Sequence, residues 1–296
     1  MPRSVRQPIH AGSWYDAEGD KLSASLTEWL RTAKRPGTAF AQAIVSPHAG
    51  YRYCGDVAAY AYSQVQVQRI KRIFILGPSH HVYLRRCALS NAAVYQTPLG
   101  SLEIDRDICA QLMATGDFQT MELDVDEAEH SIEMQLPYVR HIFRDEDIKI
   151  VPIMVGSLMA ESEARYAEIL TPYFKGASSL FVISSDFCHW GSRFSYTFQN
   201  PAQGPIHKSI EWLDRLGMDI IEKGNAPDFH AYLKSYGNTI CGRHPIGILL
   251  HILQNLTPPC KTQFVKYSQS SKCKSPQDSS VSYAAAVVCK EPHTAA

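Results

Sequence analysis

The sequence predicts an α/β fold: one three-layer α/β/α domain built on a mixed, largely parallel central sheet. Three short apolar runs, at residues 43–46, 73–76 and 180–183, are continuous rather than alternating, as is typical of strands buried on both faces. Segments with helical periodicity separate these runs, and no repeat or low-complexity linker interrupts the alternation. We therefore expect residues 1–296 to form a single domain.

The first part of the chain predicts two strand and helix units. After an N-cap at Asp16, one helix face carries four apolar residues: Leu22, Leu26, Trp29 and Leu30. The strand at 43–46 leads into a loop over 47–55, and a helix of small residues follows over 56–64. The next strand, 73–76, ends at Gly-Pro and a histidine pair.

The middle of the chain predicts a hairpin and two helices. Residues 86–102 alternate and contain turn signals at 97–100, which indicates a hairpin beside the main sheet. Asp105 is placed to cap a helix that carries Ile108 and Leu112. Residues 129–138 are predicted to form a further helix with its carboxylates near the start, where the helix dipole favours them.

The last part predicts further strands and helices. Pro152 removes one ladder donor from the strand at 148–156, which indicates an edge strand or a bulge. Helices are expected through 164–170, over 206–223, and from Pro227 and Pro245 onward. Two closing strands are expected at 263–267 and 281–288.

Composition narrows the class of protein. The 29 basic and 29 acidic side chains balance, so neither a nucleic acid nor an anionic membrane is the expected partner. The amino terminus has no apolar run after its arginines, and no stretch is long enough to insert into a bilayer. We expect a cytoplasmic protein, with the nucleus left open. The eight cysteines include no Cys-x-x-Cys, which argues against a disulfide scaffold.

Residues of the kind that bind metals follow several of the apolar runs. His48 and His80 come one or two loop residues after their strands, and Cys241 follows a short run before Gly242. Parallel strands end at one edge of the sheet, where ligands bind in open α/β sheets, so these side chains are expected to converge. Imidazole and thiolate suit first-row transition metals. The alternative, in which the histidines only cap strand ends, stays open.

The loop that contains Asp186 and His189 supplies candidate catalytic groups. His189 is placed to act as a general acid or base. Asp186 could orient a metal-binding histidine, or it could be an ordinary turn or helix-capping aspartate. Arg243, beside His244, could bind an anionic group or cap the following helix.

Aromatic residues gather near these candidate ligands. Trp14, Tyr51, Tyr53 and Trp190 fall in predicted loops, where they could line a pocket for a ring-bearing ligand or serve as packing anchors. The segment 129–133 has the sequence Glu-His-Ser-Ile-Glu. Because this is not His-Glu-x-x-His, we interpret it as helix surface or packing.

Six motifs in order resemble the Memo family, mediators of ErbB-driven cell motility. The likeness runs from about residue 10 to residue 289, which we take as the core of the domain. The motifs are HAGSWY at 10–15, PHAGY at 47–51, ILGPSHH at 75–81, EHSIE at 129–133, SSDFCHW at 184–190 and CGRHP at 241–245.

The resemblance implies a fold shared with class III extradiol dioxygenases, which hold non-haem iron with two histidines and a glutamate. His48 and His80 match the two histidine ligands, Cys241 takes the place of the third ligand, and His189 matches the region of the acid-base histidine. One iron or copper ion per chain is therefore expected. The thiolate departs from the dioxygenase pattern, because it is softer, favours copper and can itself be oxidised.

The resemblance also implies a role in signalling from receptor tyrosine kinases to the cytoskeleton. Phosphotyrosine-containing receptor tails and cytoskeletal signalling proteins would be the partners, bound at the same cleft. The pocket implied for them consists of Trp14, Tyr51, Arg52, Tyr53, His81, Trp190 and Arg243.

Three hypotheses follow. The first is a cytoplasmic metal-binding protein with metal-dependent redox activity that acts in receptor signalling and cell motility. The second is a non-catalytic phosphotyrosine-peptide-binding module in an enzyme-derived cleft. The third is a non-haem iron dioxygenase of unknown substrate. Whether the protein is an enzyme is left open; if it is, we expect a metal-dependent oxidoreductase, either a copper-dependent oxidase or a dioxygenase-like enzyme.

Overall fold

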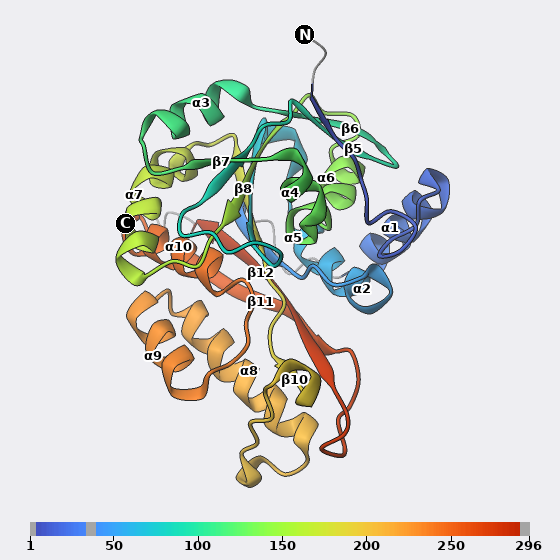
Figure 1. Ribbon diagram of the computed structural model, residues 1–296, viewed down its shortest axis with the longest axis vertical. Coiled ribbons are helices and arrows are strands. Elements are labelled where there is room, and N and C mark those ends of the chain that lie inside the picture. The colour runs from blue at the N-terminus through green and yellow to red at the C-terminus, as the bar shows by residue number, and fades with distance from the viewer. Residues whose placement is uncertain (1–3, 34–39, 291–296) are drawn as a thin grey trace, which may run out of the picture.

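The computed structural model describes residues 4–33 and 40–290 and has the predicted architecture. A central mixed sheet is covered by helices on both faces (Figure 1). Its strand order along the main path is β1-β5-β6-β8-β3-β9-β2-β12-β10. The fold class predicted from the sequence, α/β with a mixed and largely parallel sheet, is therefore confirmed.

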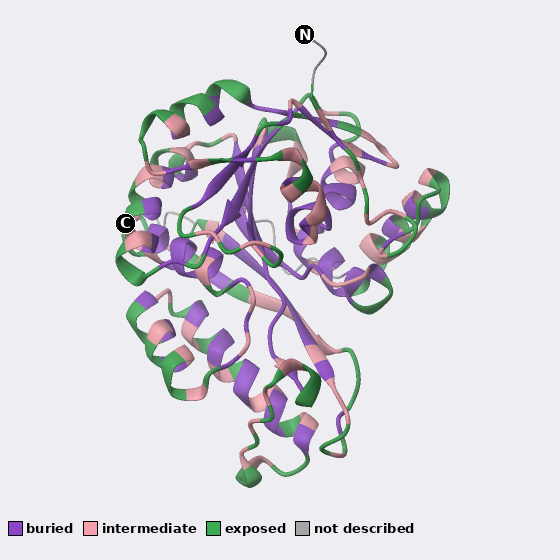
Figure 2. Cartoon of the chain, in the orientation of Figure 1, coloured by how far each residue is buried: buried purple, intermediate pink, exposed green. Residues whose placement is uncertain are grey.

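The four strands at the centre of the sheet are the three predicted from continuous apolar runs and the strand predicted at 148–156. They are β2 (Ala41–Ser46), β3 (Arg72–Pro78), β8 (Lys149–Val155) and β9 (Ser179–Ser184). The pairs β2 with β9, β9 with β3, and β3 with β8 are all parallel. Every residue of β2 and β9 is buried, as Figure 2 shows for the centre of the molecule. Because these four strands are parallel, their carboxyl ends meet at one edge of the sheet.

Helices form the two outer layers. On one side α7 (Ala160–Lys175) packs on β9, and α10 (Arg243–Gln254) packs on β3, on β9 and against α7 (Figure 1). On the other side lie α1 (Gly19–Thr32), α2 (Tyr51–Tyr62) and α6 (Leu136–Ile142). None of the helices in the described residues is both long and apolar enough to cross a membrane.

A long hairpin makes the sheet mixed. It consists of β11 (Cys260–Gln269) and β12 (Ser280–Lys290), and β12 also pairs antiparallel with β2. The hairpin extends beyond the central layers, where α8 (Ile206–Glu222) packs on β11 and α9 (Ala226–Tyr236) packs on α8 (Figure 1). The short strand β10 (His189–Trp190) joins the far end of β12, so that β12 connects this region to the central strands.

Short elements form the other end of the sheet. The predicted hairpin is present as β5 (Val94–Thr97) and β6 (Gly100–Ile104), and Asp105 caps α3 by accepting from Ile108 N at 3.1 Å. The remaining elements at this end are β1 (Val5–Arg6), β4 (Ala88–Ser90), α3 (Arg106–Ala114), β7 (Gln119–Met121) and α4 (Leu123–Ala128), while η1 (Val67–Arg69) lies between α2 and the central strand β3. The loop after β10 contains η2 (Ser192–Phe194) and η3 (Pro201–Gln203).

Two helix boundaries differ from the prediction. The helix expected from Asp56 begins at Tyr51, because the Tyr51 side chain is buried and Gly55 continues the helix where it meets the Trp29 ring. The single helix expected over 129–138 is broken into α5 (His130–Glu133) and α6. Pro137 has no N–H and belongs at the start of a helix, so it begins a new helix rather than continuing the old one.

Pro152 does not mark an edge strand. The strand β8 pairs with β3 on one side, and on its other side with β6 through Ile150 and with β4 from Ile153. Pro152 falls in the gap between these two partners, so its missing N–H costs no ladder bond on that side. The edge prediction was wrong because one strand edge is shared by two short neighbours.

Candidate metal centre and cleft

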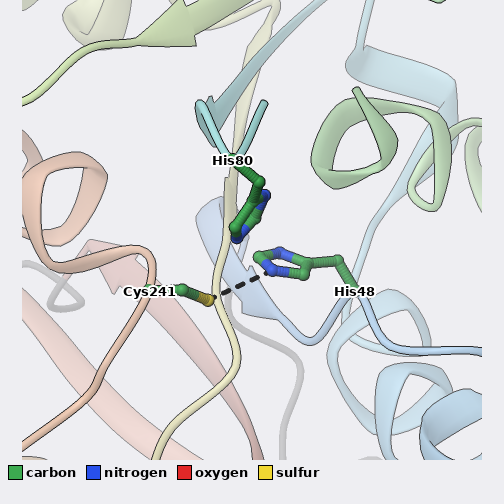
Figure 3. Close-up of side chains that lie close together, drawn as sticks. All are labelled: His48, His80 and Cys241. Atoms are coloured by element: carbon green, nitrogen blue, oxygen red, sulfur yellow. Dashed lines mark hydrogen bonds between the residues drawn. The ribbon is translucent and has the colours of Figure 1, made fainter. Parts of the chain in front are cut away.

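Three candidate ligands from separate parts of the chain meet at the carboxyl edge of the sheet. His48 follows β2, His80 follows β3, and Cys241 precedes α10 (Figure 3). One ligand atom from each lies within 4.8 Å of the others. Figure 3 shows the His48 ring and the Cys241 thiol directed toward each other, and His48 Nε2 lies 3.1 Å from Cys241 Sγ.

Hydrogen bonds fix which nitrogen of His48 faces this centre. His48 Nδ1 lies 2.8 Å from Ser184 Oγ, which donates its own proton to Ser131 O at 2.7 Å and accepts one from Gln135 Nε2 at 2.9 Å. The Ser184 hydroxyl can therefore only accept from His48, so Nδ1 carries the proton and Nε2 presents a lone pair. Burial, and then the nearby His80, lower the pKa of His48 well below its ordinary value. His48 is thus a neutral imidazole, the form that binds metals.

His80 is oriented by a carboxylate. Its Nδ1 lies 2.9 Å from Glu129 Oε1, and its backbone N–H donates to Glu129 Oε2 at 2.6 Å. Burial opposes the charge on His80, but hydrogen bonds to Cys241 and Glu129 raise its pKa to about 10. Burial likewise opposes ionisation of Glu129, but the hydrogen bond from His80 lowers the carboxyl pKa to about 2. A carboxylate that holds Nδ1–H leaves Nε2 for the centre, an arrangement common among metal-binding histidines.

The backbone holds Cys241 in place. Its Sγ accepts from Asp186 N at 3.2 Å, and Gly242 N donates to Ser185 Oγ at 3.0 Å. A Cβ at Gly242 would overlap the Ser185 side chain, so this close approach of the two loops needs glycine. The thiol is only partly buried, unlike that of Cys54 or Cys188.

Asp186 and His189, the candidate catalytic groups, lie beside the centre. Asp186 is buried and its Oδ1 accepts from His48 N at 2.8 Å, so it positions the His48 loop. Burial raises the pKa of this carboxyl. His189 Nδ1 lies 2.9 Å from Phe187 O and 3.2 Å from Thr239 O, and since both partners only accept, Nδ1 carries a proton. His189 Nε2 is therefore available for proton transfer.

The segment 129–133, interpreted from the sequence as helix surface or packing, lies at the site. The His130 ring stacks on His80 at a centroid distance of 4.4 Å, and the two form a second ligand-type group with Glu129. Burial and the neighbouring His80 lower the pKa of His130 to about 3. Packing describes Ser131 and Ile132, which are buried, and Glu133, whose buried carboxylate contacts Arg6. The sequence signal for these site residues was the Glu-His pair after an acidic run. Because that pair is not part of a known zinc motif, the segment was not predicted to lie at the site.

A cavity of about 1120 Å³ adjoins the candidate ligands. Trp14, Tyr51, Arg52 and Tyr53 line it as predicted, together with His48, His80, Asp186 and His189. Although Tyr51, Arg52 and Tyr53 were expected in a loop, they belong to the first turn of α2. The sequence did not indicate the contributions of Trp29, Arg193, Phe194 and the serines 270, 271, 279 and 280.

Three predicted pocket residues lie elsewhere among the described residues. Trp190 is buried and its Nε1 donates to Phe198 O at 2.8 Å, so it is a packing anchor. His81 and Arg243 are exposed and do not belong to the lining of this cavity. Arg243 Nη1 donates to Ile240 O at 3.5 Å. This contact lies close to the start of the following helix, where the alternative prediction placed Arg243 as a cap.

Comparison with known proteins gives matches over nearly the whole chain. A family model described as "Memo-like protein" matches residues 6–287. The chain is 52% identical over 292 residues to "Protein MEMO1" of Xenopus laevis, covering 96% of this chain and 97% of the relative. It is 50% identical over 288 residues to "Protein MEMO1" of Homo sapiens, covering 95% and 96%. Among solved structures, the uncharacterized protein JW3007 from Escherichia coli K12 aligns with a TM-score of 0.48 at 12% identity, over 82% of this chain and 98% of that one.

Proposed function

The chain belongs to the Memo family, and we propose that it holds one iron or copper ion through His48, His80 and Cys241. We further propose that it acts in the cytoplasm, in receptor tyrosine kinase signalling to the cytoskeleton and cell motility, with metal-dependent redox activity. The observation that carries the metal proposal is the convergence of two oriented imidazoles and a thiol within 4.8 Å.

The donor set fits such an ion. Metal–ligand distances of about 2.0–2.3 Å place tetrahedral ligand atoms roughly 3.4 Å apart. The 3.1 Å between His48 Nε2 and Cys241 Sγ is close to that value. One thiolate and two imidazoles form a soft set that favours Cu(I) over harder ions. Iron remains in the proposal because two histidines also occur in non-haem iron sites.

The neighbouring residues supply proton transfer and orientation. A bound iron or copper ion would provide one-electron chemistry next to the cavity. His189 can accept or donate a proton at Nε2, because its Nδ1 is held by the Phe187 and Thr239 carbonyls. Asp186 fixes the backbone of His48, and Glu129 fixes the ring of His80. Cys241, where a carboxylate would complete a dioxygenase-type site, favours a redox role over ring cleavage.

Anaerobic titration with Fe(II) and Cu(I), read by competition with a chromophoric chelator, tests the proposal. The parent protein should bind about one equivalent tightly, and His48→Ala and Cys241→Ser should both lose it. Cys289→Ser, which changes another partly buried thiol in β12, is the matched control and should bind as the parent does. Equal binding by the parent and both site variants would overturn the proposal.

The cavity favours a second candidate function, the binding of a phosphotyrosine side chain. Two guanidinium groups line it, each beside an aromatic ring: Arg52 lies 4.5 Å from the Tyr53 ring centroid and Arg193 lies 4.8 Å from that of Phe194. Arginines can donate paired hydrogen bonds to a phosphate, and the aromatic wall offers a surface for the phenyl ring.

Peptide binding measured by fluorescence anisotropy tests this second candidate. Phosphorylated peptide should bind more tightly than plain peptide, and Arg52→Ala and Arg193→Ala should each weaken it by at least about tenfold. Arg215→Ala is the control, because Arg215 makes a comparable contact with Tyr267 and does not line the cavity. Equal affinity for phosphorylated and plain peptide would rule this function out.

A further inference from the structure

A second group of ligand-type side chains lies in the helical layer, apart from the first site. Glu163 comes from α7, His230 from α9 and His251 from α10, and one ligand atom from each lies within 4.8 Å of the others. These three helices are neighbours in Figure 1, and α10 contacts both of the others. A metal ion bound here would connect all three.

The Glu163 carboxylate is buried and held by two imidazoles. Its side chain is 2% exposed, Oε2 lies 2.7 Å from His230 Nε2, and Oε1 lies 2.7 Å from His244 Nδ1. A buried carboxylate is costly unless it is paired or coordinates a metal. Its position also depends on Gly247, because a Cβ there would overlap the carboxylate. Helix α10 thus leaves room for this charge.

The hydrogen bonds around Glu163 leave two buried imidazole nitrogens unused, His244 Nε2 and His251 Nε2, and the second belongs to the group. His251 Nε2 is buried and makes no hydrogen bond within the described residues. The His251 and His230 rings are 6.1 Å apart between centroids, so both border the same carboxylate. If hydrogen bonds alone held this group together, His251 Nε2 would be expected to have a hydrogen-bond partner. A metal ion would instead use this nitrogen as a ligand.

We propose that Glu163, His230 and His251 form a zinc site. Two imidazoles and one carboxylate without a thiolate are a donor set that Zn²⁺ takes, with water in the fourth position. Binding requires the 2.7 Å between Glu163 Oε2 and His230 Nε2 to widen to roughly 3.3 Å. The His230 Nε2 proton then passes to solvent, which that side chain reaches because it is 30% exposed. His244 acts as a positioning residue, since it holds the other carboxylate oxygen.

Titration of the full chain with Co²⁺, a spectroscopic substitute for Zn²⁺, separates the two sites. Metal at His48, His80 and Cys241 would give a thiolate charge-transfer band, whereas metal at the proposed zinc site would give ligand-field bands alone. We expect ligand-field absorption that persists in Cys241→Ser and is displaced by Zn²⁺. We expect it to be lost when His251→Ala or His230→Gln is added to Cys241→Ser; in His230→Gln the amide can still donate to Glu163 but is a poor ligand.

The controls distinguish ligation from general damage to the fold. His207→Ala, which removes a partly buried histidine on α8 outside the group, should bind as the parent does. His244→Ala should weaken Zn²⁺ binding about 10- to 100-fold without abolishing it. In the Cys241→Ser background the thermal midpoint should rise with Zn²⁺, and it should stay constant once His230→Gln is added. Unchanged ligand-field absorption in both ligand variants, or none in Cys241→Ser, would overturn the proposal.

Discussion

At the scale of single residues, hydrogen bonds determine what the candidate centre can bind. Ser184 accepts from His48 Nδ1, so His48 Nε2 presents a lone pair to Cys241, and Glu129 accepts from His80 Nδ1, so His80 Nε2 is the nitrogen that a metal ion would take up by displacing its proton. Without these partners each ring could rotate or change tautomer. Substituting the residues that orient the two histidine rings therefore tests the candidate centre as directly as substituting the candidate ligands.

Glu129→Gln should weaken iron or copper binding about 10- to 100-fold, because the amide holds the His80 ring less strongly than the carboxylate does. A chelator-competition titration measures this. Glu127→Gln is the matched control, since the half-buried Glu127 carboxylate in the same segment accepts from Gln7 N and is not in contact with His80 among the described residues. Equal affinities in all three proteins would show that Glu129 does not position the ligand.

The same carboxylate predicts a pH dependence in the metal-free protein. The folded pKa of Glu129, about 2, lies below its ordinary value of 4.5, so its stabilising effect is complete above pH 4.5 and is lost as the pH falls toward 2. The difference in free energy of unfolding between the parent and Glu129→Gln should shrink by up to about 3 kcal/mol over that interval. Urea unfolding at several pH values measures it, and a constant difference would refute the assignment.

The sequence predicted the convergence of the candidate ligands better than it predicted the residues that orient them. His48, His80 and Cys241 could be predicted because each adjoins an apolar run whose end the sheet topology places at one edge. Glu129 and His130 could not, because their approach to His80 depends on where the helix over 129–138 breaks. Pro137 begins a new helix there, and nothing at Glu129 or His130 themselves indicates the break.

At the scale of elements, the cavity wall depends on close contact between α1 and α2. Gly55 lies within α2 directly against the Trp29 ring of α1, and Trp29 also lines the cavity. The sequence placed Gly55 in a loop, since glycine disfavours helices by about 1 kcal/mol. Packing against Trp29 explains why the helix accepts it, and why α2 begins five residues earlier than predicted, at 51 rather than 56.

Gly55→Ala should destabilise the protein by about 1–3 kcal/mol, because the added methyl group overlaps the Trp29 ring. In a Trp29→Leu background the same substitution should instead stabilise by about 1 kcal/mol, because the overlap is gone and alanine favours the helix. Urea denaturation of the four proteins gives the coupling energy. Destabilisation of equal size in both backgrounds would contradict the packing argument.

At the scale of the whole molecule, a buried arginine connects the amino terminus to the site. Arg6, on β1, is fully buried and pairs with Asp126 at 3.1 Å and Glu133 at 2.8 Å. Its guanidinium also donates to the carbonyl of Glu129 at 2.9 Å. The segment 126–133, which carries Glu129 and His130 to the candidate metal centre, is thus held from the far edge of the sheet.

Arg6→Ala should destabilise the protein by about 3–5 kcal/mol, because it leaves two buried carboxylates without their cation. Chemical denaturation measures this loss. Arg165→Ala removes an arginine whose ion pairs are exposed and should leave stability unchanged. If Arg6→Ala changed the free energy of unfolding only slightly, the two buried carboxylates would have to become protonated at little cost in stability.

At this scale the sequence predicted the layers but not the order of the strands. Continuous apolar runs and intervening helical segments identify a sheet covered on both faces. The position of β3 between β8 and β9, and the pairing of β8 with both β4 and β6, arise from contacts between distant segments. Pro152 is an example, because whether a proline marks an edge strand depends on which strands lie beside it, and the sequence does not give their order.

The most direct test of the metal centre is an anomalous difference map at the copper edge, from crystals of the protein loaded with Cu(I) under anaerobic conditions. The proposed centre predicts a strong peak about 2.0–2.3 Å from His48 Nε2, His80 Nε2 and Cys241 Sγ. A map with no peak between these three atoms, at full loading in solution, would contradict it.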